Sequence, residues 1–179
     1  MSILRWLGLE KEGAAGTADD DGDTETVRRI AVRLEGLAPE QRTFVAAFAY
    51  VLARVANADL RIEESEARAM ERVVAETSGL GPAEAALAVE IAKSQARLAG
   101  GTEDYVVTRE FRKVSTPEQR RALVDCLYAV AAADESVTNL ESTEIAKVAD
   151  ELGVSQQELV AIRSRYRDKL AVLKGTGRN

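Results

Sequence analysis

The stretch VANADLRIEESE at residues 55–66 returns 75 residues later as VAAADESVTNLE at residues 130–141. Each copy follows an apolar run that begins with PEQR, at 39–42 and at 117–120, and ends in Ala-Asp. An apolar segment, an acidic turn and an amphipathic segment therefore occur twice in one chain, which indicates a duplicated helical hairpin. We expect the two copies, residues 39–81 and 117–155, to pack about a pseudo-twofold axis with the two apolar helices in the centre.

Composition favours helix over sheet along the whole chain. Hydrophobic residues make up 46% of the 179 residues, which is enough for one domain with its own core, while aromatic residues reach only 4% and prolines number three. We therefore predict an all-α, single-domain bundle of seven to eight helices. Periodicity and capping signals place these helices near 26–36, 40–58, 63–77, 82–99, 103–114, 117–133, 138–151 and 156–174.

The negative charge of the chain is concentrated near its beginning. Residues 10–25 carry seven acids and one base, which accounts for the formal net charge of −6, so the remainder is formally neutral. The acidic pI therefore carries no information about the partners of the folded part. We expect a short amphipathic segment over 1–9, an acidic disordered linker over 10–25, the helical domain over 26–174 and a flexible C-terminus over 175–179.

Several classes of function are disfavoured by what the sequence lacks. Histidine is absent, which removes the usual general base, the commonest metal ligand and every imidazole-dependent triad. Cys126 is the single cysteine and lies in the apolar run ALVDCLYAV, where we expect a buried thiol. No signal sequence is recognisable, and the longest apolar run, FVAAFAYVLA at 44–53, is half the length of a membrane span. These features favour a cytoplasmic protein that is not an enzyme.

The repeated stretch has the pattern A-D-x-x-[IV]-x-x-x-E, which matches the later half of an EF-hand calcium loop. The first ligand position of such a loop would be Val55 in one copy and Val130 in the other. Leu60 and Glu135 stand where the loop glycine belongs. The sequence therefore excludes a true EF-hand.

The acids of this motif allow two interpretations. Thr138 and Glu141 have the spacing of a capping box, and Glu66 holds the equivalent position in the first copy. The aspartates each end a helix, where the helix dipole disfavours negative charge, so a local turn hydrogen bond or a divalent cation (Ca, Mg, Mn or Zn) is expected to compensate. The candidate metal ligands are Asp59, Glu63, Glu66, Asp134 and Glu141.

With the apolar helices before them, ANADLRIEESE and AAADESVTNLE resemble the tellurite-resistance TerB family over about residues 39–174. The domain of that family also forms the leading part of a membrane-anchored DnaJ-like co-chaperone. The resemblance implies an all-helical domain linked to stress and toxic-oxyanion resistance, without a defined catalysis, in which acidic residues bind metal or a partner. It marks Asp59, Glu66, Asp134 and Glu141. The glycine that follows each aspartate in the family is missing here.

A binding module that docks a protein partner is the function we favour, and a divalent-metal sensor or metal-dependent enzyme built on the repeated acids is the alternative. Docking is expected through the acidic helix starts or through an apolar surface near the N-terminus. Residues 2–9 could also fold back on the domain or contact a membrane surface peripherally, on its inner face. Nucleic acid is disfavoured because the bases after residue 155 surround an ordinary packing face. The N-terminal partner-binding candidates are Ile3, Leu4, Trp6, Leu7 and Leu9.

Overall fold

The computed structural model describes residues 21–56, 64–95, 104–133 and 137–170, and within these ranges it contains eight α-helices. This confirms the predicted all-α bundle. The first four helices are α2 (Asp21–Glu35), α3 (Pro39–Ala56), α4 (Glu64–Thr77) and α5 (Pro82–Gln95). The next four are α6 (Asp104–Val114), α7 (Pro117–Ala133), α8 (Asn139–Leu152) and α9 (Gln156–Ser164), followed by a short 3-10 turn, η2 (Arg167–Lys169).

Local sequence signals explain where most helices begin. All three prolines occupy the first position of a helix, in α3, α5 and α7, where the missing N–H costs no hydrogen bond. Before α7, the backbone N–H of Gln119 donates to Thr116 Oγ1 at 3.2 Å, and the N–H of Thr116 donates back to Gln119 Oε1 at 2.8 Å. TPEQ at 116–119 therefore forms a capping box, and SQQE at 155–158 forms another before α9.

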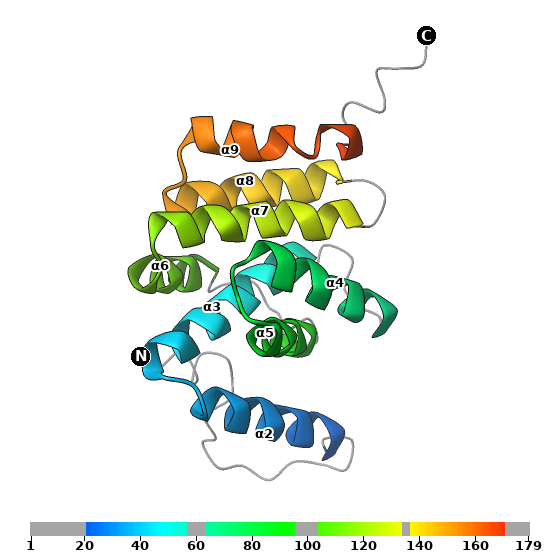
Figure 1. Ribbon diagram of the computed structural model, residues 1–179, viewed down its shortest axis with the longest axis vertical. Coiled ribbons are helices and arrows are strands. Elements are labelled where there is room, and N and C mark those ends of the chain that lie inside the picture. Colours follow the sequence, from blue (N-terminus) through cyan, green and yellow to red (C-terminus); the bar gives the residue numbers. More distant parts are fainter. Residues whose placement is uncertain (1–20, 57–63, 96–103, 134–136, 171–179) are drawn as a thin grey trace.

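The helices stack in successive layers along the long axis of the molecule (Figure 1). The edge helix α9 packs on α7 and α8, which lie side by side, and α2 lies at the opposite end against α5 and α3. Between these ends α3 packs on α5, α6, α7 and α8, whereas α7 packs on α3, α4, α8 and α9. The two apolar helices of the repeat thus lie in the middle of the bundle, as predicted.

The core follows the apolar faces of these two helices. Residues 44–49 of α3 are all buried, and Phe44 and Phe48 pack with Phe111 of α6 at ring-centroid distances of 5.0 and 6.4 Å. In α7 the buried positions include Leu127 and Tyr128. A charged residue placed on either buried face would lose its hydration without a partner, so both runs must be apolar.

The second helix of each copy packs across the molecule onto the first helix of the other copy. The amphipathic helix α4 contacts α7, and its counterpart α8 contacts α3. This reciprocal packing is what a pseudo-twofold arrangement of two hairpins requires. The copies still differ, because α8 also packs on the α7 of its own copy, while the main partners of α4 are α5 and α7.

Two predicted boundaries are wrong. Helix α2 begins at Asp21, so residues 21–25, which we assigned to the acidic linker, are helical. The last helix was predicted over 156–174 but ends at Ser164. Its end is set by tertiary contacts, because the Val137 N–H donates to Lys169 O at 2.9 Å and Leu170 bridges to Val137. Residues 171–174 lie outside the described part of the chain.

Candidate functional site

Most residues predicted to bind metal or a partner lie outside the described residues. This is true of Asp59, Glu63 and Asp134, and of the N-terminal set Ile3, Leu4, Trp6, Leu7 and Leu9. Glu66 lies in the first turn of α4, as its capping position predicts. A divalent-cation site at the two motifs therefore stays a prediction. Within the described ranges, no group of three or more histidine, cysteine, aspartate or glutamate side chains is arranged to hold a metal ion.

Glu141 is the one predicted site residue whose side chain the structure describes, and it closes a capping box. Its backbone N–H donates to Thr138 Oγ1 at 3.2 Å, and its Oε2 accepts the Thr138 N–H at 2.7 Å. This confirms the capping interpretation of the glutamate. The arrangement fixes the beginning of α8, because two backbone N–H groups that the helix itself leaves unpaired are satisfied together.

The residue that follows Thr138 and Asn139 is an exposed leucine. Leu140 has 76% of its surface accessible, more than any other large hydrophobic residue in the described part of the chain. Just before it, Val137 is buried, and its N–H is bonded to Lys169 O. The buried Val137 therefore fixes the backbone just before α8. The first turn of α8 exposes the apolar side chain of Leu140 to solvent.

A buried arginine joins the two copies of the repeat. Arg54 of α3 is 8% exposed; its Nε donates to Glu144 Oε1 at 2.6 Å, and its Nη1 donates to Glu151 Oε2 at 2.8 Å. Thr108 of α6 donates its hydroxyl to the same Glu151 oxygen at 2.7 Å. Glu144 also pairs with Lys147 at 3.2 Å. The network therefore connects α3, α6 and α8.

Burial and hydrogen bonding act in opposite directions on the ionisable groups of this network. Burial is the largest single influence and disfavours both carboxylates, but the hydrogen bonds and charges of Arg54, Lys147 and Thr108 together outweigh it and hold the pKa values of Glu144 and Glu151 below the ordinary value. Burial likewise opposes the charge of Arg54, whose bonds to the two carboxylates nevertheless raise its pKa. Sequence reasoning missed this cluster. The sequence feature that could have indicated it is Arg54 itself, which lies inside the otherwise apolar run 44–56. A buried charge needs a partner, so such an arginine predicts a nearby carboxylate.

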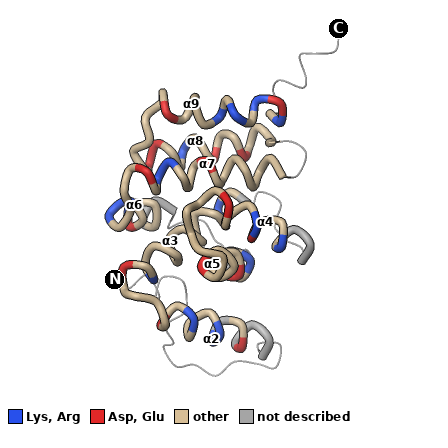
Figure 2. The backbone as a smooth tube through the Cα atoms, viewed as in Figure 1, with Lys and Arg blue, Asp and Glu red and all other residues tan. Residues whose placement is uncertain are grey.

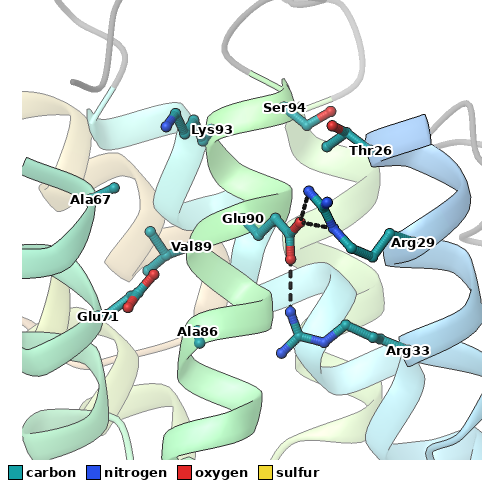
Figure 3. A pocket seen from close by; sticks show the side chains of 10 residues that line it. All are labelled: Thr26, Arg29, Arg33, Ala67, Glu71, Ala86, Val89, Glu90, Lys93 and Ser94. Carbon is teal, nitrogen blue, oxygen red and sulfur yellow. Dashed lines mark hydrogen bonds and ion pairs between the residues drawn. The ribbon is translucent and has the colours of Figure 1, made fainter. Parts of the chain in front are cut away.

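A pocket of about 320 Å³ opens between α2, α4 and α5 (Figure 3). Among the described residues, Arg29, Arg33 and Lys93 bring positive charge to its lining, and Glu71 and Glu90 bring negative charge. Glu90 of α5 accepts from two arginines of α2: Arg29 Nε lies 2.9 Å from Oε1, and Arg33 Nη1 lies 2.7 Å from Oε2. The described residues that line it are Thr26, Arg29, Arg33, Ala67, Glu71, Ala86, Val89, Glu90, Lys93 and Ser94.

Along the described helices, Lys and Arg are interspersed with Asp and Glu (Figure 2). At the basic end of α9, Arg165 pairs with Asp125 of α7 at 2.7 Å, and the Tyr166 hydroxyl donates to the same carboxylate at 2.9 Å. Tyr166 also stacks on Tyr128 with ring centroids 5.7 Å apart. These contacts fasten the end of α9 to α7. The basic residues here surround a packing contact, as the sequence predicts.

Cys126 has the properties of a small core residue. It is fully buried in α7, and burial raises the pKa of its thiol to about 11. The thiolate that nucleophilic or metal chemistry requires is therefore scarce at neutral pH. The structure confirms the burial that the apolar run around this residue predicts.

No helix in the described part of the chain is long and apolar enough to cross a membrane. No curated protein and no solved structure matches the chain. A model of the family described as tellurite resistance protein TerB matches residues 45–164, from within α3 to the last residue of α9, and so covers the second copy of the repeat and all but the first six residues of the first copy. The chain therefore belongs to the TerB tellurite-resistance family.

Proposed function

We propose that this TerB-family chain is a non-catalytic binding module in stress or tellurite resistance, and that it docks a protein partner at the beginning of α8. The observation that carries the proposal is the exposure of Leu140 next to the second copy of the acidic motif. Single exposed leucines are common on protein surfaces, so exposure alone would mean little. What distinguishes Leu140 is its place in the motif that resembles the family signature.

The rigidity of this helix start supports docking. The capping box between Thr138 and Glu141 fixes the first turn, and the buried Val137 holds the preceding backbone against residues 169–170. A partner that covers Leu140 would therefore order little of this surface on binding. Ordering costs reduce affinity, so a prearranged apolar contact is an efficient anchor for a protein partner.

The chemistry of the described residues supports a role without catalysis. The chain has no histidine, its one thiol is buried with a raised pKa, and the half-buried Glu144 and Glu151 are bound by Arg54. A general base or nucleophile must instead be accessible and near its substrate. The proposal assumes that the chain works in the cytoplasm, where its single thiol stays reduced.

Quantitative affinity capture from tellurite-treated cells of the source organism tests the proposal. The full chain, its Leu140→Ser variant and a Val32→Ser control are compared, because Val32 is also exposed, at 63%, but lies on α2 at the far end of the bundle. We expect a partner that the wild type and Val32→Ser retain equally and that Leu140→Ser loses. A partner retained by all three chains would contradict docking at α8 and would direct attention to residues 3–9.

A further inference from the structure

We propose that the chain's own N-terminal segment docks on the pocket between α2, α4 and α5 by inserting the indole of Trp6. Trp6 is the only tryptophan of the chain and the largest of the apolar residues over 2–9. The pocket has a volume of about 320 Å³, and a cavity of about 150 Å³ is already enough for benzene. An indole, which is larger than benzene by one fused ring, therefore fits this pocket.

The segment that carries Trp6 is joined directly to one wall of the pocket. Helix α2 forms this wall; it begins at Asp21 and contributes Thr26 to the lining. Residues 7–20, which connect Trp6 to α2, can span up to about 45 Å when extended, whereas α2 itself is only ~22 Å long. Such a tether makes docking intramolecular, at an effective concentration on the order of millimolar, so a weak contact is enough to populate the docked form.

The middle of the pocket is apolar. Ala67 and Val89 are buried, and Ala86 is half-buried. Helix α5 carries Ala86 and Val89 and lies between α2 and α4 (Figure 3). An aromatic ring placed against these residues is removed from water on that side, which favours docking.

Glu71 supplies an acceptor for the indole N–H. Its carboxylate lies on the α4 side of the pocket, next to Val89 (Figure 3). Glu71 is half-buried, and among the described residues no donor contacts this carboxylate. A tryptophan N–H is a donor only, and it usually finds an acceptor when it is buried. The pocket thus offers the polar partner that an inserted indole requires.

Two arginines offer flat cationic surfaces on the α2 side of the pocket. Arg29 directs both Nε and Nη2 at Glu90 Oε1, at 2.9 and 2.8 Å, and Arg33 directs Nη1 at Oε2, at 2.7 Å. Hydrogen bonds of this kind use the edges of a guanidinium group and leave its planar faces for an aromatic ring. Arg29 also keeps 57% of its side chain exposed, so stacking does not require its pair with Glu90 to break. Glu90 is therefore a positioning residue for this site.

Fluorescence of Trp6 in the purified full chain tests the docking, because selective excitation separates the single tryptophan from the four tyrosines. We expect emission at shorter wavelength than in the urea-unfolded chain, and quenching by acrylamide that is several-fold weaker. Ala86→Gln fills the pocket and should abolish both effects. Ala161→Gln, the same change at an exposed position of α9 outside the pocket, should retain them.

A second pair of variants tests the acceptor without filling the pocket. Glu71→Ala should weaken docking about tenfold, seen as acrylamide quenching that approaches that of Ala86→Gln. Glu76→Ala, an exposed glutamate of the same helix outside the pocket, should leave quenching at the wild-type level. Circular dichroism checks that each variant is folded. This pair decides the question even if glutamine at position 86 disturbs the bundle.

Three results would overturn the proposal. The first is a folded wild type in which Trp6 emits and is quenched as in the unfolded chain. The second is protection of Trp6 that persists in Ala86→Gln, which would place the indole elsewhere. The third is protection that disappears on dilution, which would assign the indole to the pocket of a second copy. Leu140→Ser should leave every readout unchanged, so the outcome is independent of the docking proposed at α8.

Discussion

Arg42 and Arg120 make the same contact in the two copies of the repeat. Arg42 Nε donates to Leu34 O at 2.9 Å near the end of α2, and Arg120 Nη2 donates to Arg112 O at 2.8 Å near the end of α6. Both arginines are the last residue of PEQR. The equivalence of the two copies therefore extends to the end of the helix that precedes each of them, α2 and α6. The packing of these two helices differs, because α2 lies against α5 and α3, whereas α6 lies against α3 and α8.

These two arginines should be equally important for stability. Each donates charged hydrogen bonds to carbonyl oxygens at or just after the end of the preceding helix, so Arg42→Ala and Arg120→Ala should each lower the free energy of unfolding by about 1–2 kcal/mol. Urea denaturation measures the loss. The exposed Arg72→Ala is the control and should stay within about 0.5 kcal/mol of wild type. A loss confined to one copy would contradict the equivalence.

Arg54 should be the most sensitive charged position in the described part of the chain. Arg54→Met leaves the carboxylates of Glu144 and Glu151 without their guanidinium partner, and we expect a loss of about 3 kcal/mol. This is the low end of the range for broken buried pairs, because both carboxylates keep some contact with water. Lys147→Met removes only an exposed ion pair of Glu144 and should cost less than about 1 kcal/mol. Equal losses in the two variants would argue against a buried network.

Acid should weaken the fold through the same two carboxylates. Their pKa values are lowered by folding, so below the ordinary glutamate pKa the unfolded chain binds more protons than the folded one. The stability that they contribute is complete above that pKa and is lost as the pH falls through the lower, folded-state values. Glu144→Gln removes one titrating group and should flatten the dependence of urea stability on pH between about 5 and 3. An unchanged slope would contradict this assignment.

In each copy, the second helix is followed by one glycine in the left-handed conformation. Gly79 follows α4 with φ 77° and Gly153 follows α8 with φ 73°. Alanine at either position should cost about 1–2 kcal/mol by thermal or urea denaturation. The added methyl group at 153 would lie 3.2 Å from the guanidinium of Arg112, which can move aside, so the two losses should be similar. Gly36→Ala, where φ is not positive, should not show this loss.

The bundle and its repeat could be read from sequence because the signals are local. Helix α7 was predicted with its observed bounds, since Thr116 and Pro117 mark its beginning and an Ala-Asp pair marks its end. The end of α9 could not be read in this way. Tyr166 and Leu170 continue the helical spacing of apolar residues, but contacts with Tyr128 and Val137 turn the chain away from the helix.

The pocket, too, could not be predicted from sequence, because tertiary packing forms it. Arg29 and Arg33 are spaced four residues apart, which is the ordinary pattern of a solvated helix face. Only the packing of α2 on α5 brings them to Glu90, some 60 residues further along the chain. The exposure of Leu140 could not be predicted from sequence either, since an apolar residue next to a capping box is usually expected to pack inward.

A photo-cross-linking amino acid at position 140 tests the docking claim most directly. The full chain carrying benzoylphenylalanine in place of Leu140 is irradiated in tellurite-treated cells and compared with a chain that carries it in place of Val32. The account predicts one discrete protein adduct at position 140 that is absent at position 32. Equal adduct patterns at the two positions, or none at position 140, would contradict partner docking at the beginning of α8.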